Sequence, residues 1–235
     1  MVSRFIHRSL ELEHLDKGDY APEEYEGCLV ELRRVNRYLG DTSALRRSLP
    51  PLIERAELRE FSVLDVGAGS GELLRAIADW ARATGRRARL VGLELNARSA
   101  AAILEESHGA AEISAVRGDA LRLPFKDDTF DYAMCSLFTH HFKDDGVISI
   151  LRELSRVSRL AVLVIDLHRH PIAYYFFTTI ARLFLHNRLI REDGGLSILR
   201  SFRPQELRCL AQQAALANVT VERRFPFRLV LSGSK

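Results

Sequence analysis

The residues best suited to chemistry in this chain surround a glycine-rich turn. Asp65 lies near the end of an apolar run, 61–66, and Gly67, Gly69 and Gly71 follow at alternate positions. Glycine has no Cβ atom, so such a turn allows a ligand to approach the backbone closely. Apolar residues behind the turn recur at helical spacing, and the start of a helix offers unpaired amide groups. This order predicts a ligand site at the carboxyl end of a buried strand.

The spacing of the glycines separates two kinds of ligand. A dinucleotide site uses Gly-x-Gly-x-x-Gly, with the pyrophosphate at the helix start. Here the third glycine comes one position early and Glu72 takes its place; a carboxylate would repel a pyrophosphate but not a cationic ligand. The stretch 65–71 resembles the first motif of class I S-adenosylmethionine (SAM) methyltransferases, in which this loop, with Ala68 between the glycines, curves round the methionine end of the cofactor. A glycine-rich turn of another α/β protein is the alternative.

Two further acids follow predicted strands in the order that this resemblance requires. Glu94 ends the run 89–94, and an acid there can accept hydrogen bonds from both ribose hydroxyls. NAD-binding folds use the same arrangement, so Glu94 does not separate the two cofactors. Asp119 and Ala120 belong to the series Gly-Asp-Ala, Leu-Pro-Phe, Asp-Asp-Thr-Phe-Asp, which is similar to that of methyltransferases related to the quinone-biosynthesis enzymes. In that family the acid matching Asp119 contacts the adenine amino group and the next residue packs on the ring.

The resemblance implies SAM as cofactor, S-adenosylhomocysteine as product, and no metal. The SAM methyl group is already activated, so the protein needs only to align a nucleophile and exclude water. The expected cofactor-binding residues are Asp65, Gly67, Ala68, Gly69, Gly71, Glu94, Leu95, Asp119, Ala120 and Ser136.

A histidine pair follows the fourth predicted strand, where the methyl group is expected to point. His140 or His141 could take the proton of a phenol, whose pKa is near 10, as the methyl transfers. Asp166 ends the fifth predicted strand and could fix the imidazole tautomer. His168 or His170 is an alternative candidate for this base. Loop histidines often only form hydrogen bonds, and many methyltransferases work by proximity without a base.

Apolar runs and helical patterns alternate beyond residue 55, which is typical of a doubly wound α/β sheet. We expect seven mostly parallel strands, the last one antiparallel, as in the resembling family. Residues 1–55 carry few strand signals and are expected to form a helical cap, with one helix from Pro22 to Gly40 and another from Asp41 to the proline pair at 50–51. Residues 56–235 then form a Rossmann-like SAM-binding domain with a hydrophobic helical insertion at about 168–202.

The insertion is rich in aromatic residues. More large apolar side chains occur there than one buried helix face needs, which predicts a hydrophobic acceptor pocket; they are Tyr174, Tyr175, Phe176, Phe177, Ile180 and Phe184. Core packing, the interface of a homodimer and an interfacial membrane helix are alternatives. The segment 191–202 resembles one in methyltransferases encoded beside bacterial type III polyketide synthases, which implies an alkylresorcinol or quinol acceptor. The glycine pair at 194–195 is expected to form a hinge or turn.

Composition argues against several other classes. The net charge of +3 is spread along 235 residues, so no nucleic-acid surface is expected. Three distant cysteines indicate reduced thiols in a cytoplasmic protein. No apolar run approaches the roughly 20 residues of a membrane-spanning helix, and the first residues lack the core of a signal peptide. We expect a small-molecule methyltransferase, most simply one that methylates oxygen; an RNA or protein methyltransferase and a non-catalytic SAM-binding subunit remain alternatives.

Overall fold

One mixed sheet forms the centre of the computed structural model, which describes residues 3–18, 20, 21, 24, 27, 28, 31, 40–180, 183 and 185–235. The strand order is β3-β2-β1-β4-β5-β7-β6, and β7 is antiparallel to both of its neighbours. The strands are β1 (Glu60–Val66), β2 (Arg87–Glu94), β3 (Ile113–Arg117), β4 (Phe130–Ser136), β5 (Ser158–Leu167), β6 (Ala217–Arg224) and β7 (Arg228–Ser234). The predicted doubly wound fold with an antiparallel last strand is confirmed.

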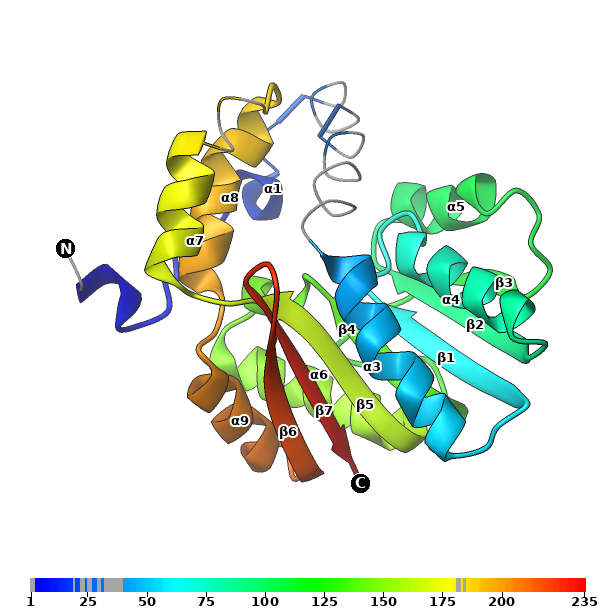
Figure 1. The fold of residues 1–235 in the computed structure, drawn as a ribbon. Coiled ribbons are helices and arrows are strands. Elements are labelled where there is room, and N and C mark those ends of the chain that lie inside the picture. Colours follow the sequence, from blue (N-terminus) through cyan, green and yellow to red (C-terminus); the bar gives the residue numbers. More distant parts are fainter. Residues whose placement is uncertain are drawn as a thin grey trace.

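Helices cover both faces of the sheet (Figure 1). The helices α3 (Asp41–Arg55), α4 (Glu72–Ala83) and α5 (Ala97–Glu106) contribute to the hydrophobic cluster on one face. The helices α6 (Asp144–Val157) and α9 (Pro204–Gln213) contribute to the cluster on the other. Side chains of β1 alternate between the two clusters, so the central strand is apolar on both faces. This double burial fixes the strand ends that carry the site.

The helix α3 continues through Pro50 and Pro51, so its predicted end at this pair is wrong. Each proline removes one amide donor from the helix. The buried stripe of the helix extends past them and is packed against the sheet; it contains Ala44, Leu45, Leu49 and Ile53. At its first turn, Asp41 accepts a buried hydrogen bond from Arg228 of β7, with 2.5 Å between Nε and Oδ1. The helix expected between Pro22 and Gly40 lies largely outside the described residues, and the division of the chain at residue 55 stays a prediction.

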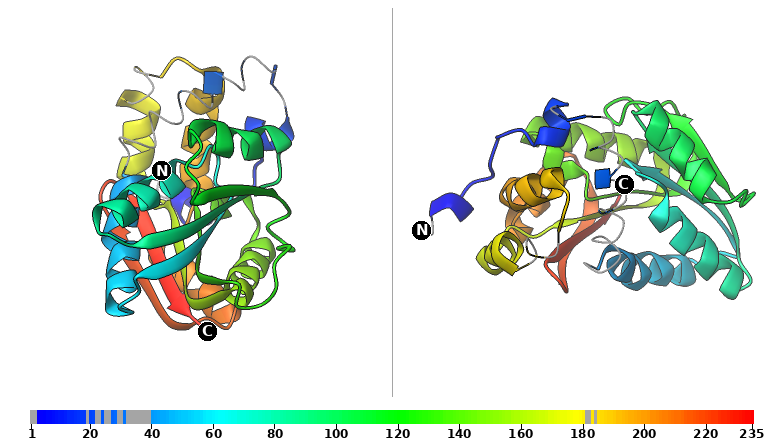
Figure 2. Two further views of the ribbon diagram at one scale, coloured as in Figure 1. Left: turned by 90° about the vertical axis from the view of Figure 1, so that its right-hand side faces the viewer. Right: turned by 90° about the horizontal axis from the view of Figure 1, so that it is seen from above.

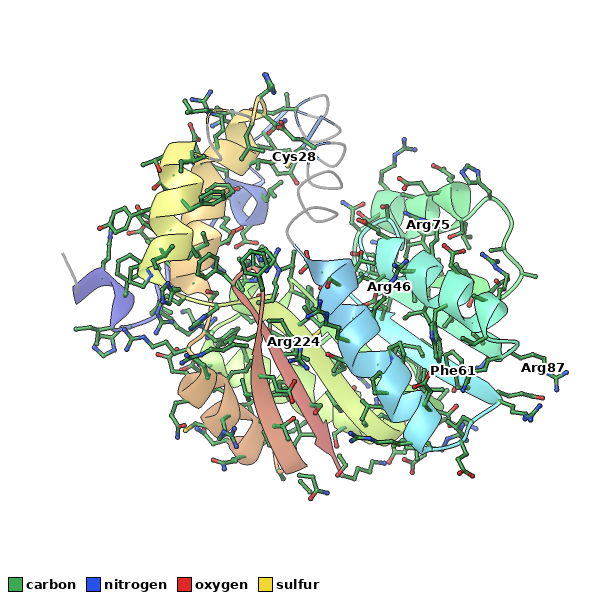
Figure 3. All side chains as sticks on the ribbon, viewed as in Figure 1. Cys28, Arg46, Phe61, Arg75, Arg87 and Arg224 are labelled. Atoms are coloured by element: carbon green, nitrogen blue, oxygen red, sulfur yellow. The ribbon has the colours of Figure 1, made fainter. Side chains whose placement is uncertain are left out.

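The insertion and the N-terminal segment lie together above the carboxyl ends of the strands (Figures 1 and 2). The insertion contains α7 (Pro171–Tyr175), η3 (Phe176–Ile180) and α8 (Arg188–Arg200). The N-terminal segment, residues 3–17, begins with η1 (Ser3–Phe5), continues without helix or strand, and ends in α1 (His14–Lys17). Cys28, labelled in Figure 3, is buried in a third hydrophobic cluster with residues of α7, η3 and α8.

Three buried or partly buried arginines hold the N-terminal segment in place through backbone atoms. Arg169 donates to the carbonyl oxygens of Phe5 and Ile6. Arg200 donates to the carbonyl oxygen of Glu11 at 2.5 Å. Arg8 within the segment donates in turn to the carbonyl oxygen of Arg200 at 2.7 Å. Because a guanidinium has five donors in a fixed plane, each arginine can join several carbonyl groups at once.

The glycine pair at 194–195 lies inside α8, so the predicted hinge or turn is wrong. A Cβ atom at Gly194 would overlap the ring of Phe177, and one at Gly195 would lie 3.0 Å from the Thr178 methyl group. The pair therefore allows η3 to pack closely against α8. Glycine lowers helix propensity by about 1 kcal/mol relative to alanine, and here the close contact of the two elements takes precedence.

The three cysteines are free thiols, as expected. Burial raises the pKa of Cys28 to about 12 and holds the pKa of Cys135 well above its usual range, so both are unreactive. Among the described residues, no helix combines the length and the apolar character that a membrane crossing requires.

Candidate active site

The loop between β1 and α4 has the conformation that its glycines permit. Gly67, Gly69 and Gly71 have φ angles of +72°, +58° and +79°, in the left-handed region. An added Cβ would lie 2.5 Å from the Phe138 ring at Gly67 and 3.1 Å from Ile103 at Gly71. At Gly69 it would meet no atom of the described part of the chain within 4 Å. Gly69 therefore borders open space, where a ligand can approach the backbone.

Glu94 contacts this loop directly. The parallel pairing of β1 and β2 places Val66 opposite Leu93, so the acid at the end of β2 reaches the glycines. Its Oε1 atom accepts a hydrogen bond of 2.6 Å from the Gly69 amide. Burial raises the pKa of Glu94, although the amides of Gly69 and Leu95 act against that shift. Glu94, which is expected to bind the ribose, therefore also stabilises the conformation of the glycine loop.

Asp65 is a buried acid for which the described residues provide no compensating cation. It is 2% exposed, and its Oδ1 atom has no hydrogen-bond partner among the described residues. Burial, followed by the nearby charge of Glu94, raises its pKa to about 8. Burying an unpaired carboxylate is costly, and a cationic ligand offsets that cost. SAM carries positive charge on its ammonium and sulfonium groups, so Asp65 and the glycine loop fit this cofactor.

Beyond Glu94, the candidate adenine side combines an acid with exposed apolar side chains. The pairing of β2 with β3 brings Asp119 to the same edge of the sheet, and its Oδ1 atom accepts a hydrogen bond of 2.9 Å from the Leu121 amide. Leu95 and Leu121 are 66% and 44% exposed, and Ala120 is buried. Ser136 ends the neighbouring strand β4. The ends of the four strands and the loops after them thus carry all ten predicted cofactor residues, and their binding roles stay predictions.

On the acceptor side, the structure joins His140 to Asp166. Both are buried, His140 in η2 (Thr139–His141) after β4 and Asp166 near the end of β5. The distance between His140 Nδ1 and Asp166 Oδ1 is 2.6 Å, and the His140 amide and the Thr139 hydroxyl donate to Oδ2. Burial acts to raise the pKa of Asp166, but the charge of His140 and these hydrogen bonds lower it to about 2. The ionised carboxylate therefore places the imidazole proton on Nδ1.

The other predicted histidines have different surroundings. His141 Nδ1 lies 2.9 Å from Asp16 Oδ1, at a partly exposed position. His170 caps α7 by accepting a hydrogen bond from the Ile172 amide at 3.2 Å. His168 is buried, and burial, followed by the charge of His170, lowers its pKa to about 4. His140 alone among the four has the expected contact with Asp166.

A cavity of about 460 Å³ opens beside His140, between the N-terminal segment, η2, the insertion and the turn that joins β6 to β7. Its wall is largely apolar and includes Leu15, Leu137, Leu167, Ile172, Ala173, Phe176, Phe177, Ile190, Ile198 and Phe225. Of the aromatic set predicted to form a pocket, Phe176 and Phe177 line it. Tyr174 and Tyr175 pack instead on Phe5, Ile180 is exposed, and Phe184 lies outside the described residues.

The N-terminal segment also contributes to the wall of this cavity, which the sequence patterns did not predict. Glu13 lines the cavity and is buried. Asp193 of α8 also lines it and accepts hydrogen bonds from the amides of His14 and Leu15 at 2.8 and 3.1 Å. Glu13 carries no signal in the sequence, because it belongs neither to a motif nor to the end of a predicted strand.

Comparisons with known proteins agree with this geometry. Residues 63–160 match the family described as a methyltransferase domain. The demethylmenaquinone methyltransferase of Bacillus subtilis is 31% identical over 173 residues, which cover 65% of this chain and 72% of that protein. The chain belongs to the class I SAM-dependent methyltransferases. Its relatives also include the 2-phytyl-1,4-naphtoquinone methyltransferase of Synechococcus elongatus, 31% identical over 165 residues, 63% of this chain and 66% of that protein.

Solved structures share the fold at low identity. A SAM-dependent methyltransferase from Aquifex aeolicus has a TM-score of 0.62 at 15% identity, over 88% of this chain and 96% of that one. The magnesium protoporphyrin IX methyltransferase of Synechocystis, with bound S-adenosylhomocysteine, has a TM-score of 0.58 at 14% identity and covers 83% of each chain. These structures confirm the fold, and membership of the SAM-dependent methyltransferases gives this chain SAM as its cofactor and S-adenosylhomocysteine as its product.

The open space at Gly69 leads to a first prediction. We expect Gly69→Val to lower SAM affinity by about tenfold or more, because the side chain would occupy the space beside the loop. Gly85→Val is the matched control: Gly85 has a φ angle of +66° and open space around it, but precedes β2 at the opposite end of the strand. Calorimetry with SAM compares the variants, and equal affinities would contradict the assignment of the loop.

The unpaired carboxyl of Asp65 leads to a second prediction. Its pKa of about 8 in the fold exceeds the ordinary value of 3.8, so between these values the unfolded chain releases a proton that the folded protein keeps. Ligand-free Asp65→Asn should therefore gain Tm over the wild type, increasingly from about pH 4 to pH 8 and constantly above it, while SAM binding weakens. Asp79→Asn, at an exposed acid of α4, is the control. A gain independent of pH would show that Asp65 is not protonated in the fold.

Proposed function

We propose that this SAM-dependent methyltransferase transfers its methyl group to the hydroxyl oxygen of a small hydrophobic aromatic acceptor, a phenol or quinol. The observation that supports this proposal is the buried His140–Asp166 pair beside an apolar cavity. Leu137 lines the cavity and Phe138 packs on Gly67 of the cofactor loop. Acceptor and cofactor sites are therefore joined through two consecutive residues.

His140 acts as the general base in this proposal. SAM supplies the electrophilic methyl group when bound at the glycine loop. Asp166 accepts the Nδ1 proton of His140 in a hydrogen bond, which leaves Nε2 to take the hydroxyl proton of the acceptor as the oxygen–carbon bond forms. The charge of Asp166 then stabilises the imidazolium. The apolar wall excludes water, so the acceptor oxygen is the nucleophile.

The size and lining of the cavity favour an apolar small molecule over a nucleic acid or protein. A volume of about 460 Å³ lies within the range of small-molecule pockets, roughly 300–1,000 Å³. The relatives named for demethylmenaquinone and 2-phytyl-1,4-naphtoquinone support an aromatic acceptor with an apolar substituent. The resemblance of the segment 191–202 to enzymes encoded beside type III polyketide synthases supports an alkylresorcinol or a related quinol.

A second candidate is methyl transfer to a ring carbon of a quinol, which the names of these relatives favour. The same base serves that reaction, because loss of a hydroxyl proton places negative charge on ring carbons as well as on oxygen. Mass spectrometry and NMR of the product separate the two, since only the O-methyl product loses a free hydroxyl.

Replacement of the base gives the next prediction. His140→Ala should lose on the order of a hundredfold or more in kcat, the usual scale of general base catalysis, while SAM affinity stays near that of the wild type. The neighbouring His141→Ala should lose less than about tenfold, because His141 lacks the contact with Asp166. Steady-state kinetics with a phenol at neutral pH provides the test. If neither variant loses about tenfold, no histidine at this position is a base.

The apolar wall predicts a dependence on the length of the acceptor. Along a series of para-alkylphenols, kcat/KM should rise roughly threefold to fourfold per methylene until the cavity is filled, because each buried methylene contributes about 0.8 kcal/mol. Phenols with polar chains of equal length should show no such rise. A kcat/KM value independent of tail length would exclude the cavity as the acceptor site.

A further inference from the structure

Glu13 reaches the acceptor cavity from the N-terminal segment, one residue before α1. Its side chain is 2% exposed, and its Oε1 atom has no hydrogen-bond partner among the described residues. Oε1 lies 4.0 Å from His140 Nε2, the nitrogen that Asp166 leaves available. Arg200 Nε lies 3.6 Å from Oε1 but donates to the His140 carbonyl oxygen. A buried carboxyl oxygen and the nitrogen of the base therefore face each other without a direct hydrogen bond.

The distance between these two atoms suits one oxygen atom placed between them. A hydrogen bond to oxygen or nitrogen spans about 2.8 Å between heavy atoms. An oxygen at that distance from both Glu13 Oε1 and His140 Nε2, themselves 4.0 Å apart, would form an angle of roughly 90° with them. A hydroxyl group in this position can donate its proton to Nε2 and accept a hydrogen bond from the Glu13 carboxyl in its protonated form. Both atoms belong to residues that line the cavity in which the acceptor would lie.

We propose that Glu13 is a second acceptor-binding residue, which together with His140 Nε2 holds the hydroxyl group that is to lose its proton. The inference rests on the proposed function of His140 and extends it to a residue far away in sequence. The hydroxyl proton points to Nε2, and the protonated Glu13 carboxyl donates a hydrogen bond to the hydroxyl oxygen, on which negative charge develops as the proton moves to Nε2. The N-terminal segment thereby completes the acceptor site.

A metal ion is the competing occupant, because Glu13, His140 and His141 bring three ligand atoms within 4.8 Å of one another. An ion about 2.1 Å from both Glu13 Oε1 and His140 Nε2 would need an angle of roughly 145° between them, far from the tetrahedral value of about 109° that zinc prefers. Moreover, His141 Nδ1 already contacts Asp16. The present spacing therefore favours a hydroxyl group over a metal ion between these two atoms.

The ionisation of Glu13 adds a pH dependence. Burial raises its pKa to about 7; the charges of His141 and Arg200 and a hydrogen bond from Ser197 act against the shift, whereas Asp16 acts with it. His140 also faces the carboxyl. Only the protonated form of Glu13 can donate to the hydroxyl oxygen, so Glu13 should contribute a fall in the kcat/KM of the wild type as it ionises near pH 7.

Binding of two matched probes isolates the contact of Glu13 with a hydroxyl group. A para-alkylphenol and the alkylbenzene of equal chain length are titrated into the wild type, Glu13→Leu and the control Glu11→Leu, whose position on the same segment is exposed. We expect Glu13→Leu, which has no donor, to weaken binding of the phenol on the order of tenfold and to leave binding of the alkylbenzene unchanged. Glu11→Leu should affect neither, and unchanged SAM affinity in all three proteins confirms their folding.

Kinetics with the same phenol completes the test. Glu13→Leu should lower kcat/KM on the order of 10- to 100-fold and remove the part of the fall near pH 7 that belongs to Glu13. Equal phenol affinity and an unchanged pH profile in Glu13→Leu would overturn the inference while leaving His140 as base. If the wild type neither binds nor methylates phenols, the proposed function fails and the inference with it. If a chelator abolishes wild-type activity and a divalent ion restores it, a metal occupies the position and the inference is wrong.

Discussion

The buried carboxylate of Asp166 is the contact on which the acceptor side of the molecule depends. It accepts hydrogen bonds from the Thr139 hydroxyl, from the amide and imidazole of His140, and from the Leu167 amide. An isolated charge at this depth would be strongly unfavourable. Four donors make the charged form the stable one, and they also fix the loop after β4 to the end of β5. One group therefore sets the backbone of η2 and the tautomer of its histidine.

The acids next to the glycine loop have pKa values shifted in the opposite direction from that of Asp166. Asp65 and Glu94 are two neighbouring acids whose pKa values are raised by burial, and one oxygen of Asp65 has no hydrogen-bond partner among the described residues. Internal donors thus compensate Asp166, whereas Asp65 has no such compensation among the described residues. This difference agrees with the expected binding of a positively charged cofactor at the glycine loop and with the proposed proton transfer at His140.

The sequence predicts those parts of the site that depend on short spacing and strand order. The glycine loop, Glu94 and Asp119 each follow an apolar strand directly, and parallel strands bring their carboxyl ends together. The contact between His140 and Asp166 follows likewise, since β4 and β5 are neighbours. Glu13 could not be found this way, because arginines distant in sequence determine its position. The predicted turn at the glycine pair of α8 and the predicted helix end at the prolines of α3 are both wrong, because tertiary packing overrides local propensity there.

The anchoring of the N-terminal segment has a consequence for how the enzyme can vary. Arg169 and Arg200 bind the carbonyl oxygens of Phe5, Ile6 and Glu11, which every amino acid possesses. These contacts do not depend on the side chains at positions 5, 6 and 11. Side chains of the segment add further contacts, since Arg8 donates to the carbonyl oxygens of Arg200 and Phe142, and Asp16 Oδ2 lies 3.0 Å from Arg200 Nη1. The Oε1 atom of Glu13 has no hydrogen-bond partner among the described residues, so a substitution at position 13 should change the wall of the cavity and leave these anchoring contacts in place.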